Sequence, residues 1–576
     1  MSFTVVRKAG VVLPITLALF AGTYQQASAD TAMQFAPVNP EFTAYQQLQS
    51  LGLAPSVSAD WHPLGYIPSP VLRPNVTSAA RNMAMMAAYP ARYDLRALGK
   101  LPAVRNQGSC GDCWAHGALS SLEGALLQAE THNFSEAHLN DTNGFSFASC
   151  HGGNDDMSTA YLARWSGAGN DADYPTPLGH NTRKIPVQKH TQNVDMLQQR
   201  TGSLDNNAIK AALMATGPVT VSYAATDTMY NKTTHAFYDP VKRTVDHEVA
   251  IVGWDDNYAA SNFKRVPAGK GAFIVRNSWG SDWGDGGYFY MSYYNATVDV
   301  GSVFTNAEPT TNYDRIYDYT PLGQTSSIGY GSTTGWFSNI FTADVTNTTI
   351  RAVSFYSSVP NSSYEVYVYN GVTAGKPTSG TAVAAATTKG TIAQAGYHTI
   401  HLTNAANVTA GGKFSVVVKL TTPGDKYPIP LESREAGYSA NATSAAGQSF
   451  TSSNGTSWSD IGKSLRSGNV SLKAFAGGTG TTPNPFAFVD QVNVAKSSVV
   501  VSNSVTISGI TSAADISITG GEYQINGGEF TSNAGQVNNG DTVTVRHTSA
   551  SSAASAVHSI VTIGGVADTF STLTAP

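Results

Sequence analysis

Three separated segments carry side chains whose chemistry fits together. Cys113 follows a glycine-containing stretch that begins at Gln107, His247 opens an apolar run, and Asn277 begins the sequence Asn-Ser-Trp-Gly. Hydrolysis by a thiol needs a nucleophilic cysteine, a base that takes and returns its proton, a group that orients the base, and donors for the oxyanion. All four residue types are present, so nucleophilic catalysis by a thiol is the first hypothesis.

The cysteine must lie where its thiolate is stabilised. From Trp114 onward, Leu119, Leu122 and Leu126 recur at helical spacing, which predicts an amphipathic helix that starts at Cys113. A thiol in the first turn of a helix faces unpaired N–H groups and the positive end of the helix dipole, which favours the thiolate. We therefore expect a reactive thiol rather than a buried small hydrophobe.

In this order, the three segments resemble the papain-like cysteine proteases over about residues 90 to 295. The resemblance implies that Cys113 is the nucleophile, that His247 is its acid–base partner, and that Asn277 holds the imidazole ring. His247 lies 134 residues after Cys113, within the spacing of about 130–150 noted for papain-type enzymes. Asn277 lies 164 residues after it, and we attribute the extra length to a surface insertion in the polar stretch 255–271.

Further roles around the catalytic residues follow from the same resemblance. Gln107 precedes the nucleophile by six positions, where the family places the amide that joins the Cys113 N–H in the oxyanion hole. Trp279 resembles the indole that shields the histidine–asparagine hydrogen bond from water. His116 departs from the family, which usually has a bulky apolar residue there, and we interpret it as a packing residue.

Five residues are expected to contact the substrate: Trp279, Gly152, Gly153, Asp246 and Glu248. Gly152 and Gly153 end the sequence Cys-His-Gly-Gly and match the place where the family pairs its backbone with an extended peptide. The absence of a side chain lets a peptide come close. Asp246 and Glu248 flank His247, and Glu248 resembles a position that lines the second substrate pocket. A carboxylate there would admit a basic side chain.

The chain has three cysteines. The family pairs the cysteine three before its nucleophile with one just ahead of the Gly-Gly pair, which implies a disulfide between Cys110 and Cys150 and a free Cys113. Two alternatives remain open. Cys110-Gly-Asp-Cys113 is also a thiol–disulfide exchange motif, although that leaves the other two motifs unexplained. The cysteines could instead ligate zinc with His116 and His151, which would consume the nucleophile. We expect no metal and no cofactor.

Composition and the N-terminus predict the compartment. Charged residues make up 13% of 576 residues, with a formal net charge of −5. No basic block suggests nucleic acid, and no long apolar run after the N-terminus suggests a membrane span in the mature protein. Arg7 and Lys8 precede the apolar stretch 11–22, and Ala27-Ser-Ala29 offers a cleavage site, as in an export signal over 1–29. We predict a secreted, bacterial protein, with a retained membrane anchor as the alternative.

The segment after the export signal and the domain that follows it are expected to differ in structure. Residues 30–88, with one short helix near 40–51, are expected to be a propeptide that covers the site, or else a disordered leader or linker. Residues 89–300 are expected to form a protease domain with a helical lobe and a β lobe. The expected helices start at 113 and span 157–165, and the expected strands cover 218–223, 248–253, 272–276 and 288–294.

Beyond residue 300, strand-like runs such as 364–369 and 413–420 alternate with turns, as in antiparallel sandwiches. Residues 309–476 look similar to the lectin-like domain that often follows bacterial and archaeal papain-like peptidases. Residues 477–484 have the composition of a linker. Residues 485–576 resemble a small immunoglobulin-like sandwich, with strands expected over 499–507 and 541–546.

The expected fold class is therefore multidomain: an α+β two-lobed protease domain followed by two all-β sandwiches. The resemblance implies a secreted cysteine endopeptidase, made as a zymogen, that cleaves protein or peptide substrates. Its C-terminal domains would bind a glycan or a cell-surface ligand. A catalytically silent adhesin on a protease scaffold is the alternative. Because the catalytic candidates all precede residue 281, a chain ending near Ala307 is expected to retain hydrolysis of short peptides.

Overall fold

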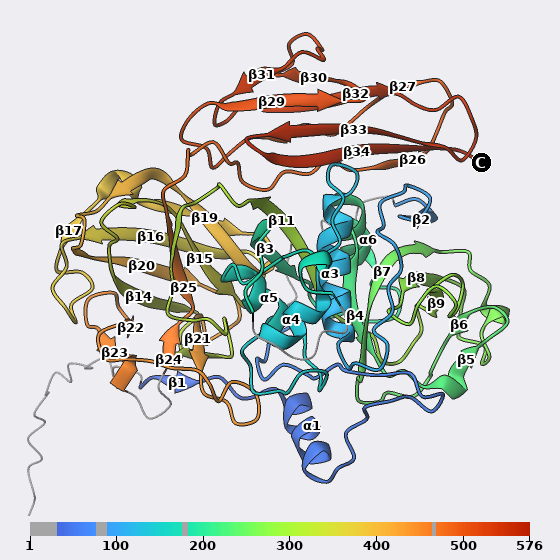
Figure 1. The fold of residues 1–576 in the computed structure, drawn as a ribbon, viewed down its shortest axis with the longest axis horizontal. Helices are drawn as coiled ribbons and strands as arrows, with labels where there is room; N and C mark the ends of the chain where they lie inside the picture. The colour runs from blue at the N-terminus through green and yellow to red at the C-terminus, as the bar shows by residue number, and fades with distance from the viewer. Residues whose placement is uncertain (1–31, 76–88, 176–182, 464–467) are drawn as a thin grey trace, which may run out of the picture.

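The computed structural model describes residues 32–75, 89–175, 183–463 and 468–576. The export signal predicted at 1–29 lies outside these residues, as does the end of the predicted propeptide at 76–88. The described chain forms a two-lobed first unit, a central β-sandwich, and a C-terminal β-sandwich that lies across both (Figure 1). This multidomain architecture confirms the expected fold class.

Three helices build one lobe of the first unit. The side chains of Ser135 and Asn154 cap two of these helices by accepting hydrogen bonds from backbone N–H groups in the first turn. The third helix begins at Cys113 as predicted, and almost every residue along it is buried. The helices are α3 (Cys113–Leu126), α4 (Glu136–Thr142) and α5 (Asp155–Ala163).

The other lobe is an eight-stranded, largely antiparallel sheet. Its apolar residues pack on both faces, and α6 (Asn207–Ala215) contacts it from outside. In spatial order the strands are β10 (Asp299–Val300), β4 (Val219–Tyr223), β7 (His247–Asp255), β8 (Ala272–Arg276), β9 (Tyr288–Ser292), β6 (Ala236–Phe237) and β5 (Tyr230–Asn231), with β2 (Arg92–Asp94) paired to β7.

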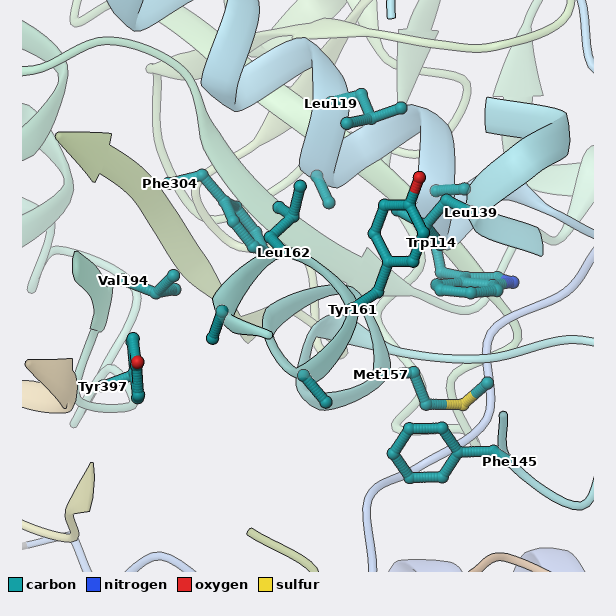
Figure 2. Packing of buried hydrophobic residues seen from close by; sticks show 14 of the residues in the cluster. Trp114, Leu119, Leu139, Phe145, Met157, Tyr161, Leu162, Val194, Phe304 and Tyr397 are labelled. Atoms are coloured by element: carbon teal, nitrogen blue, oxygen red, sulfur yellow. The ribbon is translucent and has the colours of Figure 1, made fainter. Parts of the chain in front are cut away.

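The central sandwich is built on strands from both sides of the predicted domain boundary. β3 (Lys189–Met196) precedes the β lobe in sequence, yet it lies between β11 (Ser302–Pro309) and β19 (Ala395–Asn407). Val194, Phe304 and Tyr397 from these strands join the core of the helical lobe (Figure 2). The helical lobe and the central sandwich therefore share one hydrophobic core.

The remaining strands of the central sandwich are antiparallel. The first sheet continues from β19 with β15 (Thr349–Ser357), β25 (Leu472–Ala476) and β12 (Arg315–Tyr317). The facing sheet contains β17 (Thr381–Ala382), β16 (Ser362–Asn370), β20 (Lys413–Thr421), β14 (Thr334–Thr342), β22 (Ser449–Ser452) and β23 (Ser459–Asp460), with β18 (Thr388–Ile392) on β16. A smaller sheet contains β13 (Ser326–Gly329), β21 (Ile429–Ser433) and β24 (Gly468–Val470).

The C-terminal sandwich docks on the first unit through a buried ion pair. Lys100 Nζ lies 2.8 Å from Asp490 Oδ2, and the Tyr93 hydroxyl donates to the same carboxylate. One sheet contains β26 (Gln491–Val494), β34 (Val566–Thr574), β33 (Ala556–Ile563), β29 (Ala514–Thr519) and β31 (Gly535–Val537). The other contains β27 (Val499–Val501), β32 (Thr542–Thr548), β28 (Val505–Thr506) and β30 (Glu522–Ile525).

Residues 32–75, called the N-terminal segment below, join the central sandwich to the first unit. β1 (Gln34–Phe35) adds an edge strand to β13, and α1 (Pro40–Ser50) packs Phe42 edge-on against Tyr438. The segment then runs along the first unit to reach the region of Cys113 (Figure 1). Among the described residues, no helix is long and apolar enough to span a membrane.

Candidate active site

Cys113 occupies the first turn of α3. Asp112 precedes it at the N-cap without a side-chain capping bond, so the first N–H groups of the helix stay available near the thiol. The thiol is fully buried, and its Sγ accepts a hydrogen bond from the backbone N–H of Glu248 over 3.4 Å. The nucleophile candidate thus lies where the helical lobe meets β7.

His247 opens β7 and Asn277 directly follows the neighbouring strand β8, and their side chains meet. His247 Nε2 lies 2.8 Å from Asn277 Oδ1, so the ring donates from Nε2 to the amide oxygen. The opposite ring nitrogen, Nδ1, is buried and has no hydrogen-bond partner among the described residues. Trp279 stacks on the imidazole with ring centroids 4.7 Å apart and is itself 8% exposed. The indole therefore keeps water from the His247–Asn277 bond.

Gln107 is held in place from both ends of its amide. Its Oε1 accepts a hydrogen bond from Ser278 Oγ, and its Nε2 donates to the carbonyl of Cys110 over 2.7 Å. A primary amide carries two N–H bonds, so one hydrogen remains for a substrate oxygen. Ser278, which the sequence analysis did not single out, positions this donor.

Gly152 and Gly153 lie against the N-terminal segment. The Gly153 N–H donates to the carbonyl of Gly65 over 2.9 Å, and its carbonyl accepts from the Ile67 N–H over 2.8 Å. A Cβ on Gly152 would come within 2.8 Å of the Gly65 carbonyl oxygen. The backbone expected to pair with substrate therefore pairs with the chain's own segment.

The N-terminal segment also contacts Asp246 and Trp279 of the β lobe. The Asp246 carbonyl accepts hydrogen bonds from the N–H groups of Gly65 and Tyr66. The ring of His62 stacks on Trp279 at 4.3 Å, and the Trp279 indole N–H donates to the Pro63 carbonyl. Together these contacts hold residues 62–67 over the catalytic groups.

In this covered form, burial shifts the pKa values of Cys113 and His247 in the directions that favour their neutral forms. Burial raises the pKa of the Cys113 thiol well above its ordinary value. Burial also lowers the pKa of His247 to about 4, although its bond to Asn277 acts in the opposite direction. The thiolate expected from the helix dipole is therefore not the favoured state in this covered form.

The cysteines of the loop before α3 are arranged as the resemblance implied. Cys110 and Cys150 form a disulfide, and Cys113 is the free cysteine. Within the described ranges, no group of three or more His, Cys, Asp or Glu side chains is placed to hold a metal ion.

His116, interpreted from the sequence as a packing residue, has polar neighbours. Rather than packing as an apolar residue would, it lies between Glu136 and Asp112, with ring nitrogens 3.3 and 3.6 Å from their carboxylate oxygens. The pKa of His116 is raised by these carboxylates despite its burial. Its carboxylate neighbours, rather than apolar contacts, explain a histidine at this position of α3.

Comparison with known proteins places these features in context. Residues 89–305 match the papain family cysteine proteases, and residues 316–476 match the lectin like domain family. A viral cathepsin of Adoxophyes honmai nucleopolyhedrovirus is 32% identical over 35% of this chain and 56% of its own length. Cysteine proteinase 2 of Entamoeba histolytica is 31% identical over 37% of this chain and 67% of its own length. The chain spans 56%, 57% and 37% of the first three curated relatives that it matches.

Two solved structures share the larger architecture. The cysteine protease and lectin-like domains of Cwp84, a surface layer associated protein of Clostridium difficile, superpose with a TM-score of 0.64 at 24% identity, covering 78% of this chain and 98% of that one. A cysteine-to-alanine variant of Cwp84 after propeptide cleavage superposes with a TM-score of 0.59 at 25% identity, covering 67% and 99%. The first unit and the central sandwich thus occur together in another protein.

Proposed function

Because this chain belongs to the papain family of cysteine proteases, we propose that it is a cysteine endopeptidase whose nucleophile is Cys113. The observation that carries the proposal is that Cys113, at the start of α3, accepts a hydrogen bond on Sγ from the N–H of Glu248, the residue next to His247, whose imidazole is bound to Asn277. A lone buried cysteine would not need an oriented imidazole next to its hydrogen-bond donor.

The chemistry follows from these positions. His247 takes the thiol proton, and the thiolate attacks the carbonyl carbon of the scissile peptide bond. The carbonyl oxygen becomes an oxyanion, which accepts hydrogen bonds from the Cys113 N–H and the remaining amide hydrogen of Gln107. The imidazolium then protonates the departing amine, which leaves a thioester on Cys113. Water, deprotonated by His247, hydrolyses the thioester and restores the thiol.

The proposal includes synthesis as a zymogen. The N-terminal segment takes the backbone hydrogen bonds of Gly153 and Asp246 that a substrate would need. While it stays, no peptide can reach Cys113, and the catalytic groups are held neutral. The removal of a propeptide from Cwp84 is a parallel. Export to the cell surface or the medium is part of the proposal, supported by the N-terminal sequence and the disulfide.

The test compares the full-length wild-type chain with Cys113→Ala under reducing conditions. We expect the wild-type chain to shorten at its N-terminus and digest casein. Cys113→Ala should remain at precursor length and lose at least about a thousandfold in rate. His247→Ala should behave like Cys113→Ala, whereas His132→Ala, a histidine outside the cleft, should behave like wild type. Maturation or casein digestion by purified Cys113→Ala would refute the proposal and favour the silent adhesin.

A further inference from the structure

A cavity of about 200 Å³ lies where the first unit, the central sandwich and the C-terminal sandwich meet. The helical lobe contributes the end of α3, the central sandwich contributes β3, β11 and β19, and the C-terminal sandwich contributes β34 and residues 485–487 (Figure 1). Among the described residues that line this junction cavity, none belongs to the catalytic site. We therefore consider its chemistry separately.

The central sandwich presents polar side chains to the junction cavity. Val194 of β3 and Tyr397 of β19 point into the hydrophobic core shared with the helical lobe. Because successive side chains of a strand face opposite ways, Asp195 and His398, their neighbours in the chain, face the cavity. Asp195 lies opposite Gly396, two residues before His398, so the two polar side chains lie diagonally across the strand pair.

The Asp195 carboxyl group is shielded from bulk water without a compensating partner. Burial raises the pKa of this group to about 6, and no donor or cation among the described residues acts against it. At neutral pH the carboxylate is therefore charged at a cost, which a cation entering the cavity would relieve.

His398 adds an acceptor that also lacks a partner. Its side chain is 9% exposed, and its Nε2 has no hydrogen-bond partner among the described residues. Burial lowers the pKa of His398 to about 4, and the carbonyls of Gln394 and Ala395 accept from the ring. The ring is therefore neutral, with its N–H directed at these carbonyls, and Nε2 is left to accept a hydrogen bond.

Asp568 of β34 brings a second carboxyl group from the C-terminal sandwich. Its Oδ2 accepts a hydrogen bond from the Phe488 N–H over 2.6 Å. Burial raises the pKa of Asp568 to about 6, although Lys100 acts in the opposite direction. Lys100 is itself paired with Asp490 at 2.8 Å. The junction cavity therefore has acceptors from both sandwiches and no cation of its own among its described lining residues.

The remaining walls of the junction cavity are mostly apolar. They include Leu122 and Leu126 of α3, Phe486, and Val566 of β34. Ligand sites in proteins combine such apolar walls with a few placed polar groups. Here the polar groups are acceptors, so a fitting ligand has an apolar body and a charged group rich in N–H donors, such as an ammonium, amidinium or guanidinium.

We propose that the junction cavity binds a small organic cation, whose charged group is held by the carboxylates of Asp195 and Asp568 and by Nε2 of His398. Asp195 belongs to the central sandwich and Asp568 to the C-terminal sandwich, so the bound cation joins the two. A ligand that binds only the docked arrangement stabilises that arrangement. The inference goes beyond the peptidase activity and does not depend on it.

The experiment titrates the full-length Cys113→Ala chain by calorimetry at pH 8, where both carboxyl groups are ionised. Three probes of nearly the same shape are compared: benzamidinium, benzamide and benzoate. We expect one benzamidinium to bind per chain with a Kd below about 1 mM. Neutral benzamide should bind at least about tenfold more weakly, and benzoate should not bind, because the carboxylates repel it.

Asp195→Asn and Asp568→Asn, introduced into the same chain, should each weaken the binding of benzamidinium at least about tenfold. Asp515→Asn removes an exposed carboxylate of the C-terminal sandwich and should leave the Kd unchanged. Thermal unfolding of each variant checks its fold, and Asp195→Asn should not lower the midpoint, since it removes a buried charge without a partner.

Three results would overturn the proposal. The first is the absence of saturable benzamidinium binding, as expected if water alone fills the cavity. The second is equal affinity for benzamidinium and benzamide, a comparison that needs no variant to fold. The third is a Kd for benzamidinium that Asp195→Asn and Asp568→Asn leave unchanged, which would place the bound probe elsewhere.

Discussion

Gly153 lies between the helical lobe and the N-terminal segment. A Cβ at this position would lie 2.4 Å from the Trp114 ring, nearer than non-bonded carbon atoms come. We expect Gly153→Ala to lower the free energy of unfolding by about 1–3 kcal/mol, because the indole must shift within a close-packed core. Gly202→Ala is the control, since a Cβ there meets nothing within 4 Å. Equal thermal unfolding midpoints for the two variants would contradict this account.

The state of the Cys113 thiol should differ between precursor and mature protein. Burial raises the thiol pKa in the covered form, so the reactive thiolate becomes common only as the pH rises beyond the ordinary cysteine range. After the segment leaves, the imidazolium of His247 stabilises the thiolate and lowers that pKa. At pH 6 we expect iodoacetamide to modify the mature protein at least about a hundredfold faster than the intact precursor. Comparable rates at pH 6, followed by intact mass, would show that the segment does not control the thiol.

Among the elements, the N-terminal segment is expected to keep the precursor latent through its contacts with the first unit. Tyr66 lines a cavity with Asp155 and Asp299 of the first unit, whereas Trp61, five residues earlier, is 82% exposed. Tyr66→Ala should weaken the hold of the segment and raise the peptide hydrolysis of uncleaved precursor at least about tenfold. Trp61→Ala removes a larger aromatic ring from the same segment and should leave the precursor latent. A precursor that is equally latent with either substitution would place its inhibitory contacts elsewhere.

The elements that the sequence predicts well are those with strong local patterns. The helix at Cys113 and the short helix α1 begin where expected, and β8 has the expected bounds. β3 was missed because its sequence, Lys-His-Thr-Gln-Asn-Val-Asp-Met, has few apolar residues. All of its residues except Asp195 are nevertheless buried, because strands on both sides cover it. Tertiary contacts, not local pattern, decide this strand.

In the candidate site, too, residues in local motifs can be predicted from the sequence, whereas residues placed by tertiary contacts cannot. Cys113, His247 and Asn277 lie in motifs that can be read from the chain, and Gln107 lies six residues before the nucleophile. Asp299 carries no motif and lies opposite Ser222 only because β10 pairs with β4. Its position depends on strand register, which the sequence alone does not reveal.

At the scale of the whole molecule, the shared core predicts that the first unit depends on the central sandwich. A chain ending at Pro309 keeps β11 but strips β19 from β3, which exposes a strand edge and removes Tyr397 from the core. We expect its unfolding midpoint to fall by more than about 10 °C, with a loss of soluble protein. A chain ending at Ala476 loses only the C-terminal sandwich and should unfold closer to full length. If the chain ending at Pro309 has the same unfolding midpoint as the full-length chain, the two units are independent.

The central claim is that one thiol, Cys113, performs the chemistry of the entire 576-residue chain. The most direct test is titration of the mature protein with an epoxysuccinyl inhibitor, following peptide hydrolysis and intact mass in the same samples. We predict one adduct per chain, mapped to Cys113, with activity falling in proportion to adduct and reaching zero at one equivalent. Hydrolysis that persists when Cys113 is fully modified, or full inhibition without an adduct on Cys113, would contradict the account.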